Sequence, residues 1–246
     1  MIKHSLLLTL LLASPNAIAI NGGIPVDWRT PMAQTFVSLA EGVSIYELSR
    51  SFCSGVLLSD RALVTAAHCL YGKNPKRLFV TLGTDGNQSD SLRPTSRFVI
   101  HPSYQPYGNQ LPNIRNTSDI ALLFFEGGLP QGYLPALLAS SLQNLARGHG
   151  VISIAGFGNP NHGVLYACNT QLQDQSFSES EIELYGDWSC SPNGGDSGGA
   201  TYRVIGKRIV LFGIHNWGWS NPDGTPLYSV EASIPYYHAW IQNLIN

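Results

Sequence analysis

From Ile20 onward, the chain alternates short apolar runs with turn residues. Each run is four to six residues long, and Gly, Pro, Asn or Asp separates most of them. Such a pattern, without the intervening helices of a parallel sheet, is typical of antiparallel barrels and sandwiches. It therefore predicts an all-β protein. The runs lie at 35–39, 55–58, 78–82, 120–125, 151–155, 164–167, 201–204, 209–214 and 227–230.

Residues 236–245 change to a helical period and predict a short C-terminal helix packed on the body. The longest stretch without a predicted strand lies between Phe125 and Val151. Because it separates two halves of similar strand content, we place a junction near Gly132, with units at 20–132 and 133–246. The apolar side chains on the predicted helical face are Tyr237, Trp240, Ile241, Leu244 and Ile245.

The first 19 residues have the layout of a secretory signal peptide. Lys3 precedes the apolar run Leu6 to Ala13, and Ala17-Ile18-Ala19 forms a small-residue cleavage site. The apolar run is too short to span a bilayer, and no later segment reaches the necessary length of about 18 residues. We expect an exported protein, extracellular or periplasmic, that has no membrane partner.

The net charge of −2 argues against nucleic acid as a partner. The four cysteines indicate two disulfides in an exported protein, with three possible connectivities. No Cys or His spacing indicates a metal site, and no motif indicates a cofactor, so we expect neither. We also expect a monomer.

The segment NGGDSGGA, Asn193 to Ala200, places a serine between glycines. Glycines let the backbone approach a substrate closely and leave N–H groups to bind an oxyanion, so Ser197 is a candidate nucleophile. A glycine-rich surface turn is the plain alternative. The segment also fits the nucleophile turn of α/β-hydrolases, whose acid and base would then be Asp223 and His238.

A serine nucleophile needs a base, and the base needs a carboxylate to orient it. His68 in ALVTAAHC follows an apolar strand, where the small residues Ala66 and Ala67 leave room for an imidazole. Asp119 directly precedes an apolar strand, so it is drawn toward the core, where an unpaired charge is costly. A buried structural histidine and a solvated aspartate are the alternatives. Other histidines fall in the signal, in loops or on the terminal helix, at positions 4, 101, 149, 162 and 238.

Four segments in this order resemble the chymotrypsin/trypsin family of serine endopeptidases: INGG at Ile20, TAAHC at His68, SDIALL at Asp119 and GDSGG at Ser197. The segments FCSGVLL and AGFG add two further matches. The order His, Asp, Ser also opposes the α/β-hydrolase interpretation, in which the serine comes first. The resemblance spans nearly the whole chain after residue 19.

The resemblance implies two six-stranded antiparallel β-barrels packed orthogonally, with the active site between them. His68 would be the general base, Asp119 would orient it, and Ser197 would attack the peptide carbonyl. The N–H groups of Gly195 and Ser197 would form the oxyanion hole. Peptides or proteins would be the substrates.

The resemblance also implies a disulfide between Cys53 and Cys69, which leaves Cys168 with Cys190. In the family, a new N-terminal amine folds inward and pairs with the aspartate before the nucleophile, here Asp196. The signal cut after Ala19 would itself expose Ile20. We therefore expect export and activation to be one event, and the short signal without a pro-segment points to a bacterial source.

The predicted substrate pocket departs from the family pattern, because Asn193 replaces a usual cysteine. A gap-free count places Ser191 at the pocket base, which suits a neutral P1 side chain. If Cys190 is instead the displaced family cysteine, Asp187 or Trp188 lies there, and Asp187 would favour Lys or Arg. This choice stays open.

The segment GIHNWG resembles the family strand that lines the pocket. Asn216 replaces a usual serine there and retains a donor for Asp119. Glutamate-specific relatives place a histidine in a similar segment, so His215 would bind an acidic P1 group, unless it is only a structural histidine. Pro226 stands where the family has a small glycine and would narrow the pocket. Trp217 and Gly218 complete the predicted pocket strand.

Two further interpretations remain open beside the endopeptidase. A serine esterase is disfavoured by the motif order. A binding protein on a protease scaffold is disfavoured because His68, Asp119 and Ser197 are all present. Such a protein usually loses one of the three, but the altered pocket keeps this interpretation open.

Overall fold

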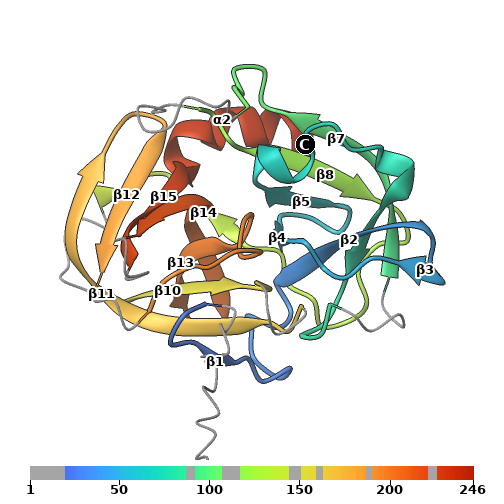
Figure 1. The fold of residues 1–246 in the computed structure, drawn as a ribbon, viewed down its shortest axis with the longest axis horizontal. Helices are drawn as coiled ribbons and strands as arrows, with labels where there is room; N and C mark the ends of the chain where they lie inside the picture. The colour runs from blue at the N-terminus through green and yellow to red at the C-terminus, as the bar shows by residue number, and fades with distance from the viewer. Residues whose placement is uncertain are drawn as a thin grey trace, which may run out of the picture.

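The structure is a computed structural model that describes residues 20–86, 92–106, 117–143, 151–158, 163–186, 190–220 and 226–246. The predicted signal, residues 1–19, lies outside this part of the chain. Two β-barrels lie side by side, and a helix runs across one side of them (Figure 1).

The first barrel is a closed antiparallel sheet. Its strands pair in the order β2-β4-β5-β8-β7-β6, and β6 pairs back with β2. The short strand β3 extends β2 as a hairpin. The bounds are β2 Phe36–Ser44, β3 Glu47–Leu48, β4 Cys53–Leu57, β5 Ala62–Thr65, β6 Leu78–Thr81, β7 Leu92–Ile100 and β8 Ala121–Phe125, with 3₁₀ turns η1 Ala67–Cys69 and η2 Pro75–Arg77.

The second barrel pairs its strands in the order β11-β10-β13-β14-β15-β12, and β12 pairs with β11. Two short strands are added to it: β1 pairs with β11, and β9 pairs in parallel with β14. The bounds are β1 Ile24–Pro25, β9 Leu137–Leu138, β10 Val151–Gly156, β11 Tyr166–Phe177, β12 Glu181–Gly186, β13 Ala200–Ile205, β14 Arg208–Ser220 and β15 Pro226–Ser233. The prediction of two six-stranded antiparallel barrels is confirmed.

The apolar runs and the segment ALVTAAHC predicted the well-buried strands but missed β7 and β12, as well as the two-residue strands β1, β3 and β9. All four residues of β6 are buried, and its run was predicted. β7 carries mostly partly buried and exposed side chains, and β12 alternates glutamate with apolar residues, so neither has a continuous apolar run. Strand β11 also continues to Phe177, well beyond the end of its predicted run at Ala167. The prediction ended early because mostly polar residues follow Cys168, and these do not form an apolar run.

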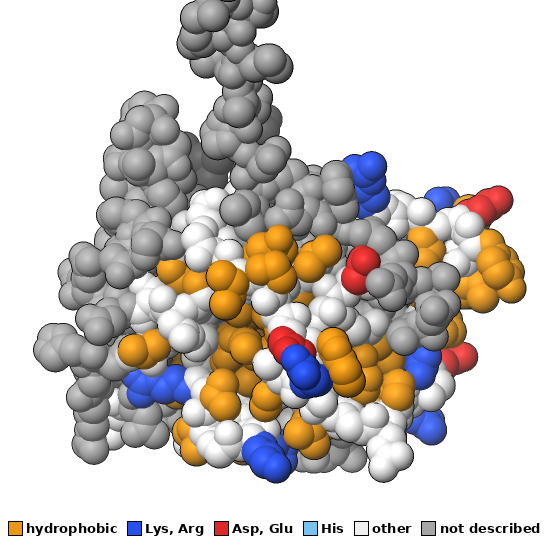
Figure 2. All heavy atoms as spheres, turned by 90° about the horizontal axis from the view of Figure 1, so that it is seen from below, with side chains coloured by type: hydrophobic (Ala, Val, Ile, Leu, Met, Phe, Trp, Pro, Cys, Tyr) orange, Lys and Arg blue, Asp and Glu red, His pale blue; other side chains and the backbone are white. Residues whose placement is uncertain are grey.

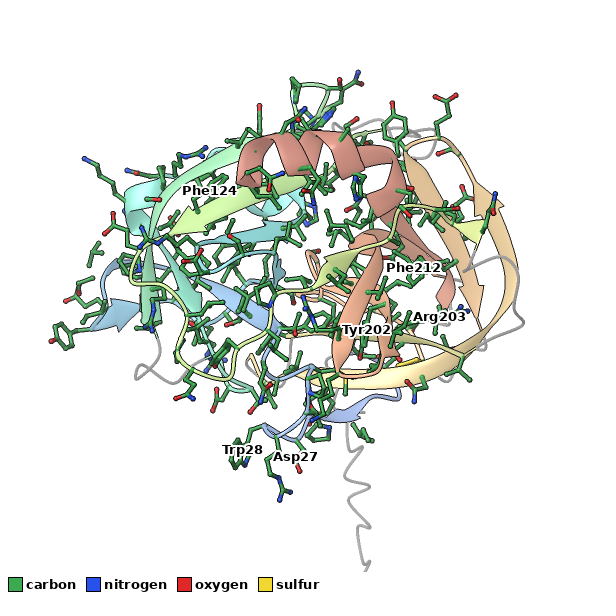
Figure 3. All side chains as sticks on the ribbon, turned by 180° about the vertical axis from the view of Figure 1, so that it is seen from behind. Asp27, Trp28, Phe124, Tyr202, Arg203 and Phe212 are labelled. Atoms are coloured by element: carbon green, nitrogen blue, oxygen red, sulfur yellow. A yellow bond between two sulfur atoms is a disulfide. The ribbon has the colours of Figure 1, made fainter. Side chains whose placement is uncertain are left out.

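The largest core cluster spans both barrels. Phe36 on β2 and Tyr202 on β13 are fully buried, and their ring centroids lie 5.3 Å apart. Figure 3 shows Tyr202 among the strands, whereas Asp27 and Trp28 project outward from the loop after β1. Because the two barrels share this core, they form one packed body and hold fixed positions at their interface.

The C-terminal helix α2 spans Ile234–Ile245, so it begins two residues before the predicted start. Pro235 lies in its first turn, where the missing N–H of proline costs no helical hydrogen bond. The predicted face is confirmed, because Tyr237 and Ile241 are buried and the remaining members pack against the core. The ring of His101 packs edge-on against Tyr237 and Trp240, at centroid distances of 5.0 and 4.9 Å.

Candidate active site

His68 and Asp119 form a hydrogen-bonded pair at one end of the first barrel. Nδ1 of His68 lies 2.7 Å from Oδ2 of Asp119, and the main-chain N–H of His68 donates to Oδ1 at 2.8 Å. Asp119 is only 1% exposed, whereas the His68 side chain is 27% exposed. The carboxylate therefore holds one edge of the imidazole, and part of the His68 side chain reaches solvent.

Strand pairing explains why two residues far apart in sequence meet here. β5 ends at Thr65, which pairs with Ala121 at the start of β8. The residues just beyond these two ends, His68 and Asp119, therefore emerge at the same edge of the barrel. The disulfide between Cys53 and Cys69 fixes the η1 turn that carries His68.

The second barrel also contacts this pair. The side-chain amide of Asn216 on β14 donates to the main-chain oxygen of Asp119 at 2.9 Å and to that of Ile214 at 3.2 Å, in the amide orientation that satisfies its neighbours. The donor expected at this position is therefore present, but it binds the main chain of Asp119.

Ser197 lies in the turn that enters β13, against the first barrel. The N–H of Ser54 donates to the main-chain oxygen of Ser197 at 2.8 Å, and Ser54 adjoins the Cys53–Cys69 disulfide. Gly198 has φ +79°, and a Cβ there would collide with Thr65 Oγ1 and the Ser54 oxygen. Only glycine allows this close approach of the serine turn to strands β4 and β5 of the first barrel.

The N–H groups of Gly195 and Ser197 have no acceptor within the part of the chain that the structure describes. Neighbouring N–H groups in the same turn are occupied: Asp196 donates to the main-chain oxygen of Asn193 at 3.0 Å, and Gly198 donates to that of His215 at 2.8 Å. Gly195 has φ +88°, which turns the backbone sharply before the serine. Two open donors in one turn are what the binding of an oxyanion needs.

Asp196 lies in a closed socket with Ile20. The main-chain nitrogen of Ile20 donates to Oδ2 of Asp196 at 2.9 Å, and the N–H groups of Gly158 and Asn193 each donate to its carboxylate at 2.8 Å. Burial is the largest influence on this carboxyl group and raises its pKa despite these bonds. A Cβ at Gly156 would collide with the same carboxylate, which explains the glycines of the AGFG segment.

Ile20 has φ +40°, a left-handed conformation that β-branched residues avoid. The angle φ is defined by the peptide bond to the preceding residue. A cut before Ile20 would remove that bond and the strain with it, and it would replace a neutral amide by a charged amine facing Asp196.

The Cys168–Cys190 disulfide lies beside this socket, because both cysteines pack with Ile20 and Ile154. Cys190 is therefore joined to β11 and not to the strand after GIHNWG. The next residue, Ser191, is buried and pairs with Asn21 through its main chain, and its hydroxyl accepts from Asn21 at 3.2 Å. The loop that carries the predicted pocket base is thus tied to the N-terminal segment.

His215 on β14, the strand that contains the predicted pocket segment GIHNWG, forms a buried pair with Glu231 on the neighbouring strand. Nδ1 of His215 lies 2.6 Å from Oε1 of Glu231 on β15, and the two residues are 3% and 0% exposed. Ser229 Oγ also donates to Glu231 at 3.2 Å. The ring of Trp217 contacts that of Tyr228, with centroids 6.0 Å apart, and Gly218 pairs with Ser229.

Glu231 was not predicted from the sequence. Its only signal is one acidic residue inside the otherwise uncharged run LYSVEAS. Its pairing with His215 depends on the register between β14 and β15, which the sequence does not reveal. The alternative pocket residues Asp187 and Trp188 lie outside the described residues.

The antiparallel barrels are incompatible with an α/β-hydrolase fold, so the nucleophile turn of that class is a wrong interpretation of the serine segment. His238 lies on α2, and Asp223 lies outside the described residues. His101, packed against α2, belongs to the core contacts of that helix.

The sequence model of the Trypsin family matches residues 30–241. The chain belongs to the trypsin family. It is 29% identical to a trypsin of Phaedon cochleariae over 227 residues, which cover 81% of each chain. It is also 28% identical to trypsin beta of Drosophila erecta over 264 residues, covering 95% of this chain and 97% of that protein. This trypsin-family chain is therefore a serine-type peptidase by family, as its motifs predicted.

Other possible sites contribute little. Among the described residues, one cluster groups potential metal ligands, Cys53, His68 and Cys69, but its sulfurs are joined in a disulfide and are not thiolates.

A separate groove of about 760 Å³ runs beside β1 and is lined by Ile24, Val151 and other residues, none of them from the predicted active site. Figure 2 shows hydrophobic side chains on the underside of the molecule. No described helix is long and apolar enough to cross a membrane.

Proposed function

We propose that this protein is a secreted serine endopeptidase that hydrolyses peptide bonds through Ser197, His68 and Asp119. The observation that carries the proposal is the bond from His68 Nδ1 to the buried Asp119 carboxylate at 2.7 Å, beside the turn that holds Ser197. Family membership supports the same reaction class.

In this mechanism, His68 removes the proton of the Ser197 hydroxyl as the oxygen attacks the scissile carbonyl carbon. Asp119 keeps Nδ1 protonated and stabilises the imidazolium that forms. The tetrahedral oxyanion receives hydrogen bonds from the N–H groups of Gly195 and Ser197. His68 then protonates the leaving amine, and a water molecule hydrolyses the acyl-enzyme by the same steps.

Activation would follow the cut between Ala19 and Ile20. The new amine supplies a positive charge to the Asp196 carboxylate, whose pKa is raised by burial in the uncut chain. Since Asp196 lies between Gly195 and Ser197, a stable Asp196 carboxylate also holds the two oxyanion donors in place. Removal of the signal would thus complete the active site.

For the substrate pocket, we propose Ser191 as the base and a neutral P1 side chain. The Ser191 hydroxyl is uncharged, and Nδ1 of His215 is already occupied by its bond to Glu231. The bond of Cys190 to Cys168 supports the gap-free count, because Cys190 is then not the displaced pocket cysteine.

The test incubates the chain that starts at Ile20 with a diverse peptide mixture and maps the cleavage sites, with Ser197→Ala as the matched control. Cuts that depend on Ser197 and follow neutral residues are the expected result. Cuts after Lys or Arg would assign the pocket to Asp187, and cuts after Glu or Asp would assign it to His215. A folded protein that makes no cut would contradict the endopeptidase and favour a binding role.

A further inference from the structure

The turn that precedes Asp119 holds an unfavourable backbone conformation. Ser118 has φ +49°, in the left-handed region that non-glycine residues seldom occupy. The N–H of Ile120 donates to the Ser118 oxygen at 2.8 Å, so the chain turns tightly at Asp119 itself. Such a conformation persists only where surrounding contacts enforce it.

One of these contacts comes from the second barrel. Glu181 on β12 is 5% exposed, and its Oε1 accepts from the N–H of Thr117 at 3.0 Å and from the Thr117 hydroxyl at 3.2 Å. Thr117 is itself 1% exposed. A buried carboxylate is costly unless it is hydrogen-bonded, and two donors of one residue meet that need here.

Glu181 is well placed to act as a fixed support. Its own N–H donates to Ser178 Oγ at 3.0 Å, and its main-chain oxygen accepts from the Ser178 N–H at 3.0 Å. It also pairs with Ala232 in the β12–β15 ladder. The carboxylate therefore projects from a rigid part of the second barrel onto the turn of the first.

We infer that Glu181 is a positioning residue for Asp119, acting through Thr117 and the strained Ser118. The line of contacts runs from Glu181 to Thr117 and along the chain to Asp119, whose carboxylate holds His68. A loss of the Glu181 contact lets the turn relax and moves the Asp119 carboxylate relative to the imidazole. This inference rests on the proposed function.

The experiment compares Glu181→Ala and Glu181→Gln, with Glu183→Ala on the same strand as the matched control. Glu181→Ala is expected to lower kcat by roughly 10- to 100-fold with little change in KM, because small misplacements of catalytic groups cost that much. Glu181→Gln keeps an oxygen acceptor for Thr117 and should retain most of kcat. Glu183→Ala should have the kcat and KM of the parent protein.

A second readout is the low-field proton NMR signal of His68 Nδ1–H, which reports the bond to Asp119 directly. It should persist in Glu181→Gln and weaken or shift in Glu181→Ala, at temperatures where thermal unfolding shows both variants folded. If Glu181→Ala does not fold, Thr117→Val replaces it, and a smaller loss of kcat with a shifted signal is expected.

An unchanged kcat and proton signal in the folded variant would overturn the role of Glu181. An equal loss of kcat in Glu181→Gln and Glu181→Ala would also overturn the role of Glu181, because the oxygen acceptor that holds Thr117 would then not be what positions Asp119. If Ser197→Ala is as active as the parent protein, or if the parent protein has no activity, the proposed function is contradicted instead. The two failures are therefore distinguishable.

Discussion

The main-chain nitrogen of Ile20 donates to Oδ2 of Asp196 at 2.9 Å, inside a socket where both residues are fully buried. The carboxylate also receives the N–H groups of Gly158 and Asn193. Burial nevertheless raises its pKa, so hydrogen bonds to neutral donors do not compensate the desolvation of this charge. A charged amine on Ile20 would supply the missing attraction.

We expect Asp196→Asn, made in the chain that starts at Ile20, to lower kcat/KM by roughly 10²- to 10³-fold, the usual effect of losing an oxyanion donor. The amide cannot attract the amine as a carboxylate does, so the Gly195 and Ser197 donors lose their support. Steady-state kinetics on a peptide substrate measure the effect. Asp27→Asn, at an exposed aspartate, is the control, and equal activities of the two variants would contradict the prediction.

We expect the exported chain to begin at Ile20, and a chain that retains Ala19 to be less active. Retention keeps the nitrogen as an amide and preserves the strained φ of +40° at Ile20. Intact mass spectrometry of the exported protein gives the cut position, and kinetics on both chains compare their activities. A fully active protein that begins at another residue would contradict the hypothesis that one cut both exports and activates the protein.

Activity should fall at alkaline pH. An unperturbed α-amine has a pKa near about 8, and pairing with a carboxylate raises it. The stabilisation from a group with a raised pKa is complete below the unperturbed value and is lost as the pH rises through the raised value. A profile of kcat/KM from neutral to alkaline pH tests this, and activity that stays constant far above a pH of about 8 would argue against an essential amine.

His101 should make the fold less stable in acid. Burial lowers its pKa, so the neutral ring is favoured against Tyr237 and Trp240. Its contribution is present above the unfolded pKa, about 6.5, and is lost as the pH falls through the lowered folded value. The thermal midpoint of the parent should therefore drop more between about pH 7 and about pH 5 than that of His101→Gln. Parallel curves for the two proteins would show that His101 is not the cause.

The sequence by itself determined the barrel class, the terminal helix and the residues proposed for catalysis. Short apolar runs mark strands with continuous burial, and the segments around His68, Asp119 and Ser197 carry local patterns that are visible in one sequence. These signals are local, because a strand core or a glycine-rich turn depends on neighbouring residues.

Only the tertiary structure decided which distant residues meet. Glu231 lies beside His215 because of the register between β14 and β15, and Glu181 lies beside Thr117 because the two barrels pack together; no local pattern specifies either contact. The polar strands β7 and β12 were missed because their residues do not form a continuous buried run. A buried charge is stable only next to its partner, and that partner is chosen by strand register and by the packing of the two barrels, not by the neighbouring sequence.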